Sequence, residues 1–161
     1  MRPALLLLAV LTLPACDAVS DAVDDAACQA SGYADSGTVR ATVSGDSFSG
    51  TCVRVDRESG TLTIVGADNV VSQNDQEIIT LALPSDDLRS YDLSNDVATA
   101  AFARRTEDPN DQSDEVYVAT SGTLTVTAVS DDSAEGTFAF SARNASGATV
   151  EVSGGRFDVS F

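Results

Sequence analysis

The acidic segment at residues 108–115 contains the side chains that come nearest to a metal-binding pattern. Its oxygen-bearing side chains recur at every second position and belong to Asp108, Asn110, Gln112 and Asp114. Calcium-binding loops use such spacing because a curved backbone points alternate oxygens at the ion, at about 2.3–2.6 Å. Ser113 and Ala119 stand where an EF-hand loop has its turning glycine and its bidentate glutamate. We therefore interpret the segment as a solvated acidic hairpin loop, and we expect neither a metal nor another cofactor.

The sequence lacks the side chains on which most acid–base and nucleophilic catalysis depends. It contains no histidine, which excludes a Ser-His-Asp triad, a Cys-His dyad and an imidazole metal ligand. Paired carboxylates occur at residues 24–25, 86–87 and 131–132, too often for any one pair to be distinctive. The absence of tryptophan also removes the usual stacking surface for sugars. We expect that the protein is not an enzyme.

The N-terminal residues have the pattern of a secretory signal peptide. Arg2 supplies a positive charge, and residues 5–13 form an apolar run that only Thr12 interrupts. A charged start, a short apolar stretch and a small residue at the cleavage point are typical of export signals. The run is shorter than the roughly 20 apolar residues that cross a bilayer. We predict that residues 1–15 are removed on export.

The end of this segment resembles the lipobox of bacterial lipoproteins. Leu13, Ala15 and Cys16 occupy the −3, −1 and +1 positions around the expected cleavage point, and Pro14 at −2 departs from the usual pattern. The resemblance implies that Cys16 carries a lipid, through which the protein is held at a membrane.

With Cys16 assigned to the lipid, the two remaining cysteines form a pair. Outside the cytoplasm a disulfide between Cys28 and Cys52 is the expected state. In the chain-entropy account this link stabilises the fold by about 3 kcal/mol. Two buried free thiols are the alternative, whereas a zinc site is disfavoured because the sequence has no histidine.

Residues 16–37 are predicted to be an acidic tether, flexible or partly helical, between the anchor and the folded domain. Val19 and Val23 lie four positions apart, as on one face of a short helix. The aspartates behind Cys16 resemble the surface-export signals of some lipoproteins, whereas Asp17 directly after the cysteine resembles an inner-membrane retention signal. We expect the cell envelope as location, with the outer membrane or cell surface favoured over the inner membrane.

The charge balance is strongly acidic. All nine basic residues are arginine against 25 acidic residues, and the net charge is −16. Such a surface repels the phosphates of nucleic acids and of anionic lipid headgroups. We therefore exclude nucleic acid as a partner. A saline habitat and a GC-rich genome account equally well for this composition.

From residue 38 onward the pattern changes to short strands rich in valine and threonine, separated by turn sequences. The expected strands are residues 38–43, 48–55, 61–65, 78–83, 97–105, 116–120, 123–129, 137–142, 148–152 and 157–161. The alanines of residues 97–105 leave a helix there as an alternative, and Ser121-Gly122 has the form of a two-residue hairpin turn. About ten short strands at this spacing predict an all-β domain over residues 38–161, an antiparallel sandwich or barrel.

The apolar side chains of these strands are predicted to form a single core. They are Val39, Val43, Phe48, Leu62, Ile64, Ile79, Leu81, Leu83, Val118, Leu124, Val126, Phe138, Phe140, Val150, Val152, Phe157 and Val159.

Three segments resemble a known family. Residues 38–50 (TVRATVSGDSFSG), 136–142 (GTFAFSA) and 154–161 (GGRFDVSF) are similar to exported bacterial lipoproteins that carry a β-rich domain of unknown function. The resemblance covers about residues 38–161. It implies a β-rich domain behind a lipobox, and it implies neither an activity nor any functional residue.

Two functions remain open. In the first, the protein is a lipid-anchored, non-catalytic binding or structural module that contacts an envelope protein or a glycan. In the second, it is a calycin-like carrier with a small apolar ligand inside the barrel. The few aromatic residues and the lack of tryptophan favour the first. A closed barrel around an apolar cavity is typical of the carrier, and a filled interior of the module.

Overall fold

The computed structural model describes residues 26–68, 70, 76–95, 97–105 and 115–161. The predicted signal peptide at residues 1–15 and the predicted lipid anchor at Cys16 lie outside the described residues. The same holds for the calcium-candidate side chains of Asp108, Asn110, Gln112 and Asp114.

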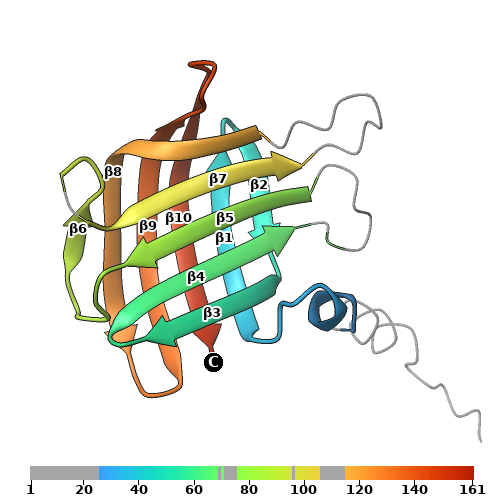
Figure 1. The fold of residues 1–161 in the computed structure, drawn as a ribbon, viewed down its shortest axis with the longest axis vertical. Coiled ribbons are helices and arrows are strands. Elements are labelled where there is room, and N and C mark those ends of the chain that lie inside the picture. Colours follow the sequence, from blue (N-terminus) through green and yellow to red (C-terminus); the bar gives the residue numbers. More distant parts are fainter. Residues whose placement is uncertain (1–25, 69, 71–75, 96, 106–114) are drawn as a thin grey trace, which may run out of the picture.

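Ten strands and a helical turn at residues 26–30 make up the regular structure of the described residues (Figure 1). The strands are β1 (Ser36–Val43), β2 (Asp46–Gly50), β3 (Cys52–Glu58), β4 (Thr61–Asp68), β5 (Gln76–Leu83), β6 (Ser90–Asp92), β7 (Thr99–Arg105), β8 (Glu115–Val129), β9 (Ser133–Arg143) and β10 (Thr149–Ser160). They form one antiparallel sheet in the order β2-β1-β10-β9-β8-β7-β5-β4-β3, with β6 paired to β8. The all-β, antiparallel fold predicted from the sequence is confirmed.

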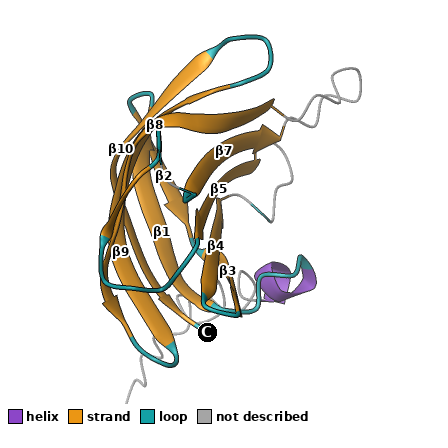
Figure 2. Ribbon diagram, turned by 60° about the vertical axis from the view of Figure 1, so that its left-hand side comes forward, coloured by secondary structure: helices purple, strands orange, loops and turns teal. Residues whose placement is uncertain are grey.

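The sheet curls into a nearly closed barrel because β2 and β3 are consecutive halves of one bent segment. β2 pairs with β1 at one end of the strand order, and β3 pairs with β4 at the other. Asp35 joins the two ends. Its backbone N–H donates to the carbonyl oxygen of Val53 at 3.2 Å, and its Oδ2 accepts from the backbone N–H of Val55 at 2.7 Å. Figure 2 shows the resulting two layers, with β1, β9 and β10 facing β3, β4, β5 and β7.

The predicted hairpin turn at Ser121-Gly122 is wrong. Both residues lie inside β8, which runs through them without a turn. Gly122 has φ 133° and lies beside a register shift, so it marks a β-bulge. A Cβ at Gly122 would come within 2.2 Å of the carbonyl oxygen of Ala139, so the glycine permits close contact between β8 and β9.

Two other strand predictions are corrected in a similar way. The expected strands at residues 148–152 and 157–161 are one strand, β10, with a bulge between Val152 and Gly155. The expected strand at residues 48–55 is instead divided at Thr51 into β2 and β3. Glycine occurs at bulges as well as at turns. Only the pairing with a neighbouring strand shows whether a given glycine lies in a bulge or in a turn.

The interior is filled by apolar side chains that include the large rings of Tyr91, Phe102 and Phe157, all fully buried. Several rings lie directly over inward-facing glycines. A Cβ at Gly136 would meet Phe157 Cζ at 2.3 Å, and a Cβ at Gly155 would meet the ring of Phe138 at 2.4 Å. Because glycine has no side chain, these positions on one strand leave room for rings from the neighbouring strand. The rings fill the barrel, so that it has no wide lumen.

The predicted core is confirmed except at two positions. Val150 is only partly buried, although it packs against the core, and Val118 is 51% exposed. The prediction for Val118 is wrong because the pairing of β7 with β8 places Tyr117 on the inner side, opposite Phe102. Its neighbour Val118 must then point outward.

Replacing Gly136 by alanine should destabilise the fold, because the new methyl group would overlap the ring of Phe157 and the carbonyl oxygen of Thr125. We expect a loss of about 1–3 kcal/mol in the free energy of unfolding, measured by denaturant titration. Gly154→Asn is the control: it has open space and φ 61°, which asparagine adopts readily. Equal losses for the two variants would contradict the filled interior.

Candidate functional site

The barrel interior is occupied by protein. The rings of Phe102 and Tyr117 have their centroids 6.1 Å apart, and those of Phe138 and Phe140 are also separated by 6.1 Å. These rings belong to one continuous apolar cluster with the buried side chains of both layers. A hollow of about 720 Å³ is on the surface instead, where Ser44, Glu151 and Ser153 are among its lining residues.

One end of the barrel is closed around Arg57 at the end of β3. Its guanidinium forms an ion pair with Asp86, which lies between β5 and β6. Nη1 also donates to the backbone oxygens of Ser130 and Asp131 at 3.1 and 3.3 Å, in the turn between β8 and β9. The guanidinium carbon lies 5.8 Å from the ring centroid of Phe161. One arginine therefore ties together four segments that meet at this end.

The other end is closed by polar side chains from β5, β7 and β8. Arg104 donates to Glu77 Oε1 from Nε at 3.1 Å and from Nη2 at 2.6 Å. This hydrogen bonding raises the pKa of Arg104. The hydroxyl of Tyr117 donates to Glu115 Oε2 at 2.9 Å. Burial raises the pKa of Tyr117, and the bond to Glu115 acts in the same direction, so the phenol stays protonated as a donor.

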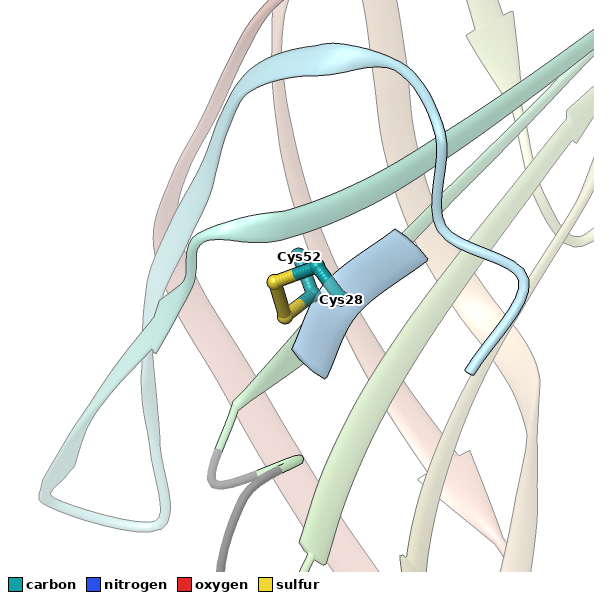
Figure 3. Close-up of a disulfide and its surroundings, with 2 residues drawn as sticks. All are labelled: Cys28 and Cys52. Carbon is teal, nitrogen blue, oxygen red and sulfur yellow. A yellow bond between two sulfur atoms is a disulfide. The ribbon is translucent and has the colours of Figure 1, made fainter. Parts of the chain in front are cut away.

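The segment before β1 is fastened to the outside of the barrel. Figure 3 shows the disulfide between Cys28, on the helical turn, and Cys52, at the start of β3. The Cα atoms of this pair are 5.2 Å apart, and the predicted bond is present. Cys28, Cys52, Ala67 and Val70 form a second small apolar cluster, against which Tyr33 and Ile78 pack. Residues 26–35, assigned to the tether from the sequence, therefore pack against the barrel in this structure.

Beside this cluster lies a sheet face without a carboxylate, bordered by Arg105 at the end of β7. It is made of outward-pointing positions of β4, β5, β7 and the first part of β8, whose neighbours in each strand point into the core. We name it the uncharged face; its residues are Thr63, Val65, Ile78, Thr80, Ala82, Thr99, Ala101, Ala103, Val116 and Val118. Val116 and Val118 are 48% and 51% exposed. Exposed large apolar side chains gathered on one face are typical of an interaction surface.

The strand register aligns this face in straight rows. One row runs across six strands in the order Arg54, Val65, Thr80, Ala101, Val118 and Arg143. Its length is about 24 Å, because neighbouring strands are about 4.8 Å apart. Arg54 is paired with Asp56 at 3.0 Å, and Arg143 Nε donates to the carbonyl oxygen of Gly147 at 3.3 Å. The row is therefore uncharged between two arginines.

Sequence reasoning did not find the uncharged face, although one signal was present. Residues 78–83 (IITLAL) are apolar at both alternating sets of positions, whereas a strand with one solvated face alternates with polar residues. Both sides of β5 carry apolar side chains for this reason: Ile79 faces the core, and Ile78 faces outward.

The described ranges contain neither a candidate metal cluster nor a helix that could span a membrane. No three cysteine, aspartate or glutamate side chains of those ranges gather in a way that could hold a metal ion. Among the helical residues that the structure describes, none forms a helix long and apolar enough to cross a membrane.

A family profile matches residues 35–159 and so covers nearly all of the described barrel. The chain belongs to the DUF6252 family. This family is described as a domain of unknown function, which agrees with the β-rich domain of unknown function expected from the sequence. The DUF6252 match begins at Asp35, the residue that joins the two ends of the sheet. No curated protein and no solved structure shows significant similarity to the chain.

Arg57 and Arg54 of β3 offer a matched test of how the barrel end is closed. Arg57→Ala removes an ion pair, two backbone contacts and a cation–π contact, and we expect it to lower the unfolding free energy by about 2 kcal/mol. Arg54→Ala removes an exposed ion pair and should cost about 0.5 kcal/mol or less. Thermal and denaturant unfolding measure both. Similar losses would show that Arg57 does not hold this end closed.

Proposed function

We propose that this DUF6252 protein is a lipid-anchored, non-catalytic module of the cell envelope that acts through its outer surface. The observation that carries the proposal is the filled interior. Aromatic rings packed against glycines occupy the barrel, and the hydrogen bonds and ion pairs of Arg57 and Arg104 close its ends. The binding surface must then lie outside, and the uncharged face is the described surface best suited to it.

The lipid anchor is supported by the lipobox-like residues 13–16 and by the way the chain enters the fold. The disulfide at Cys28 fixes the chain to β3, so that only residues 17–25 separate Cys16 from the packed helical turn. The ten residue-to-residue steps from Cys16 to Ala26 span at most about 36 Å, whatever the conformation of the chain. An anchor at Cys16 therefore keeps the barrel close to the membrane surface.

The charge restricts the partners of such a module. At a net charge of −16, an approaching surface of the same sign is repelled over roughly a Debye length of 8–10 Å. We infer that a partner in the envelope, protein or glycan, presents a neutral or basic surface. Where charge contributes to this contact, added salt weakens it.

A carrier of small apolar ligands is the second candidate. The closed order of antiparallel strands favours it, because such barrels can hold a ligand. The interior side chains argue against it, since Tyr91, Phe102 and Leu124 fill the centre with no exposure to solvent. We therefore place the carrier second.

Cys16→Ser should abolish incorporation of a fatty-acid probe and release the protein from the membrane fraction, because the acylated thiol is lost. The double variant Cys28→Ser/Cys52→Ser is the control: it removes the disulfide cysteines and should keep the label. Label that persists in Cys16→Ser, or is absent from the unaltered chain, would refute the lipid anchor.

Titration of the purified domain with a fluorescent fatty acid distinguishes the module from the carrier. We expect no saturable binding at one ligand per chain, because a ligand would have to displace buried rings. Saturable binding that Gly136→Ala weakens would place the ligand in the interior and promote the carrier.

A further inference from the structure

We propose that the uncharged face is the side of the barrel that lies against the lipid bilayer. This inference rests on the lipid anchor proposed above and adds the orientation that the anchored domain takes. The opposite layer, built by β1, β9 and β10, then faces the aqueous side.

Electrostatic repulsion favours this orientation. The phosphates of a bilayer repel carboxylates, so an acidic domain approaches them with the face that carries the fewest. The uncharged face has none. At its β3 edge Arg54 pairs with Asp56, and Glu58 is exposed at the end of the strand. Arg105 and Arg143 add positive charge at its other borders.

The opposite layer carries charges of both signs. Glu135 and Asp158 lie directly across from each other on β9 and β10, and Arg40 and Arg156 do so on β1 and β10; all four are exposed. Turning that layer to the lipid would place carboxylates over phosphates.

The path of the anchor chain favours the same orientation. The helical turn at residues 26–30 lies on the outside of β3, where Cys28 is bonded to Cys52 (Figures 2 and 3). Ala67 and Ile78 lie beneath it, and Ile78 is itself part of the uncharged face. The chain toward Cys16 thus leaves the barrel beside this face. The point from which the chain runs to the anchor, with a reach of at most about 36 Å, is therefore on the side of this face.

The shape of the face also fits a bilayer surface. Its side chains are alanine, threonine, valine and one isoleucine, all short, and they lie on one stretch of sheet. None of them lines the surface hollow beside Ser44, Glu151 and Ser153. Such a face suits an extended flat surface better than a small ligand. The apolar centre can rest at the boundary of headgroups and acyl chains, while Arg143 reaches a lipid phosphate.

A second copy of the chain is the main competing occupant. It would bring another net charge of −16 against the first, whereas a zwitterionic bilayer brings no net charge. The charge balance therefore favours the bilayer. Contact with a second copy depends on the number of protein molecules per vesicle, whereas contact with the bilayer does not, and this difference distinguishes the two occupants.

The test uses the full lipidated chain in phosphatidylcholine vesicles, labelled with bimane at Val118→Cys or, as matched control, at Thr137→Cys on the outer side of β9. The native residues at both positions are exposed and β-branched. Cys28 and Cys52 are bonded to each other, so the introduced thiol is the one that reacts with the label. On vesicle attachment, acrylamide quenching at position 118 should fall severalfold and quenching by nitroxide-labelled lipid should rise. Neither should change at position 137. Adding Val116→Asp should restore acrylamide quenching at 118, with an unchanged unfolding midpoint as evidence of intact folding.

The outcomes separate this inference from the lipid anchor. A chain that fails to float with the vesicles refutes the anchor, and the orientation with it. A chain that floats with equal quenching at both positions keeps the anchor and overturns the orientation. Shielding at position 118 that disappears as the protein is diluted in the vesicles also overturns it, because the face is then covered by a second copy.

Discussion

The bend between β2 and β3 is the constraint on which the rest of the structure depends. Because these strands continue each other, one segment pairs with β1 and then with β4, and the two ends of the sheet are brought together. Along the edge of β3 that faces away from β4, a short stretch of backbone has no partner strand. Asp35 supplies the hydrogen-bond partners there, with its backbone N–H as donor and its carboxylate as acceptor. Without this contact, backbone groups of β3 would stay unpaired at a sheet edge.

Closure of the sheet decides where the apolar side chains can go. A barrel of this size has a narrow interior, and the rings of Phe138 and Phe157 fit there only because glycines face them. The strands carry more apolar side chains than the interior of the barrel can accommodate. The surplus on β5, β7 and β8 forms the uncharged face. The filled core and the apolar outer surface are thus two results of the same closure.

The disulfide connects this architecture to the N-terminal segment. It fixes Cys28 over the outside of β3, next to Ala67 and Ile78, so that the small cluster and the uncharged face are continuous. A cross-link over 24 positions also restricts the unfolded chain, which contributes about 3 kcal/mol in the chain-entropy account. One bond therefore serves stability and sets the point at which the chain leaves the barrel.

The sequence by itself determined the all-β fold, most of the core and the pairing of Cys28 with Cys52. These follow from local signals, namely alternation of apolar residues, turn composition and cysteine count. It could not distinguish a turn from a bulge at Ser121-Gly122, because glycine suits both and only the pairing of β8 with β9 decides. It also placed Val118 in the core. Inside and outside are assigned by strand register, and register is a property of neighbouring strands that only the tertiary structure fixes.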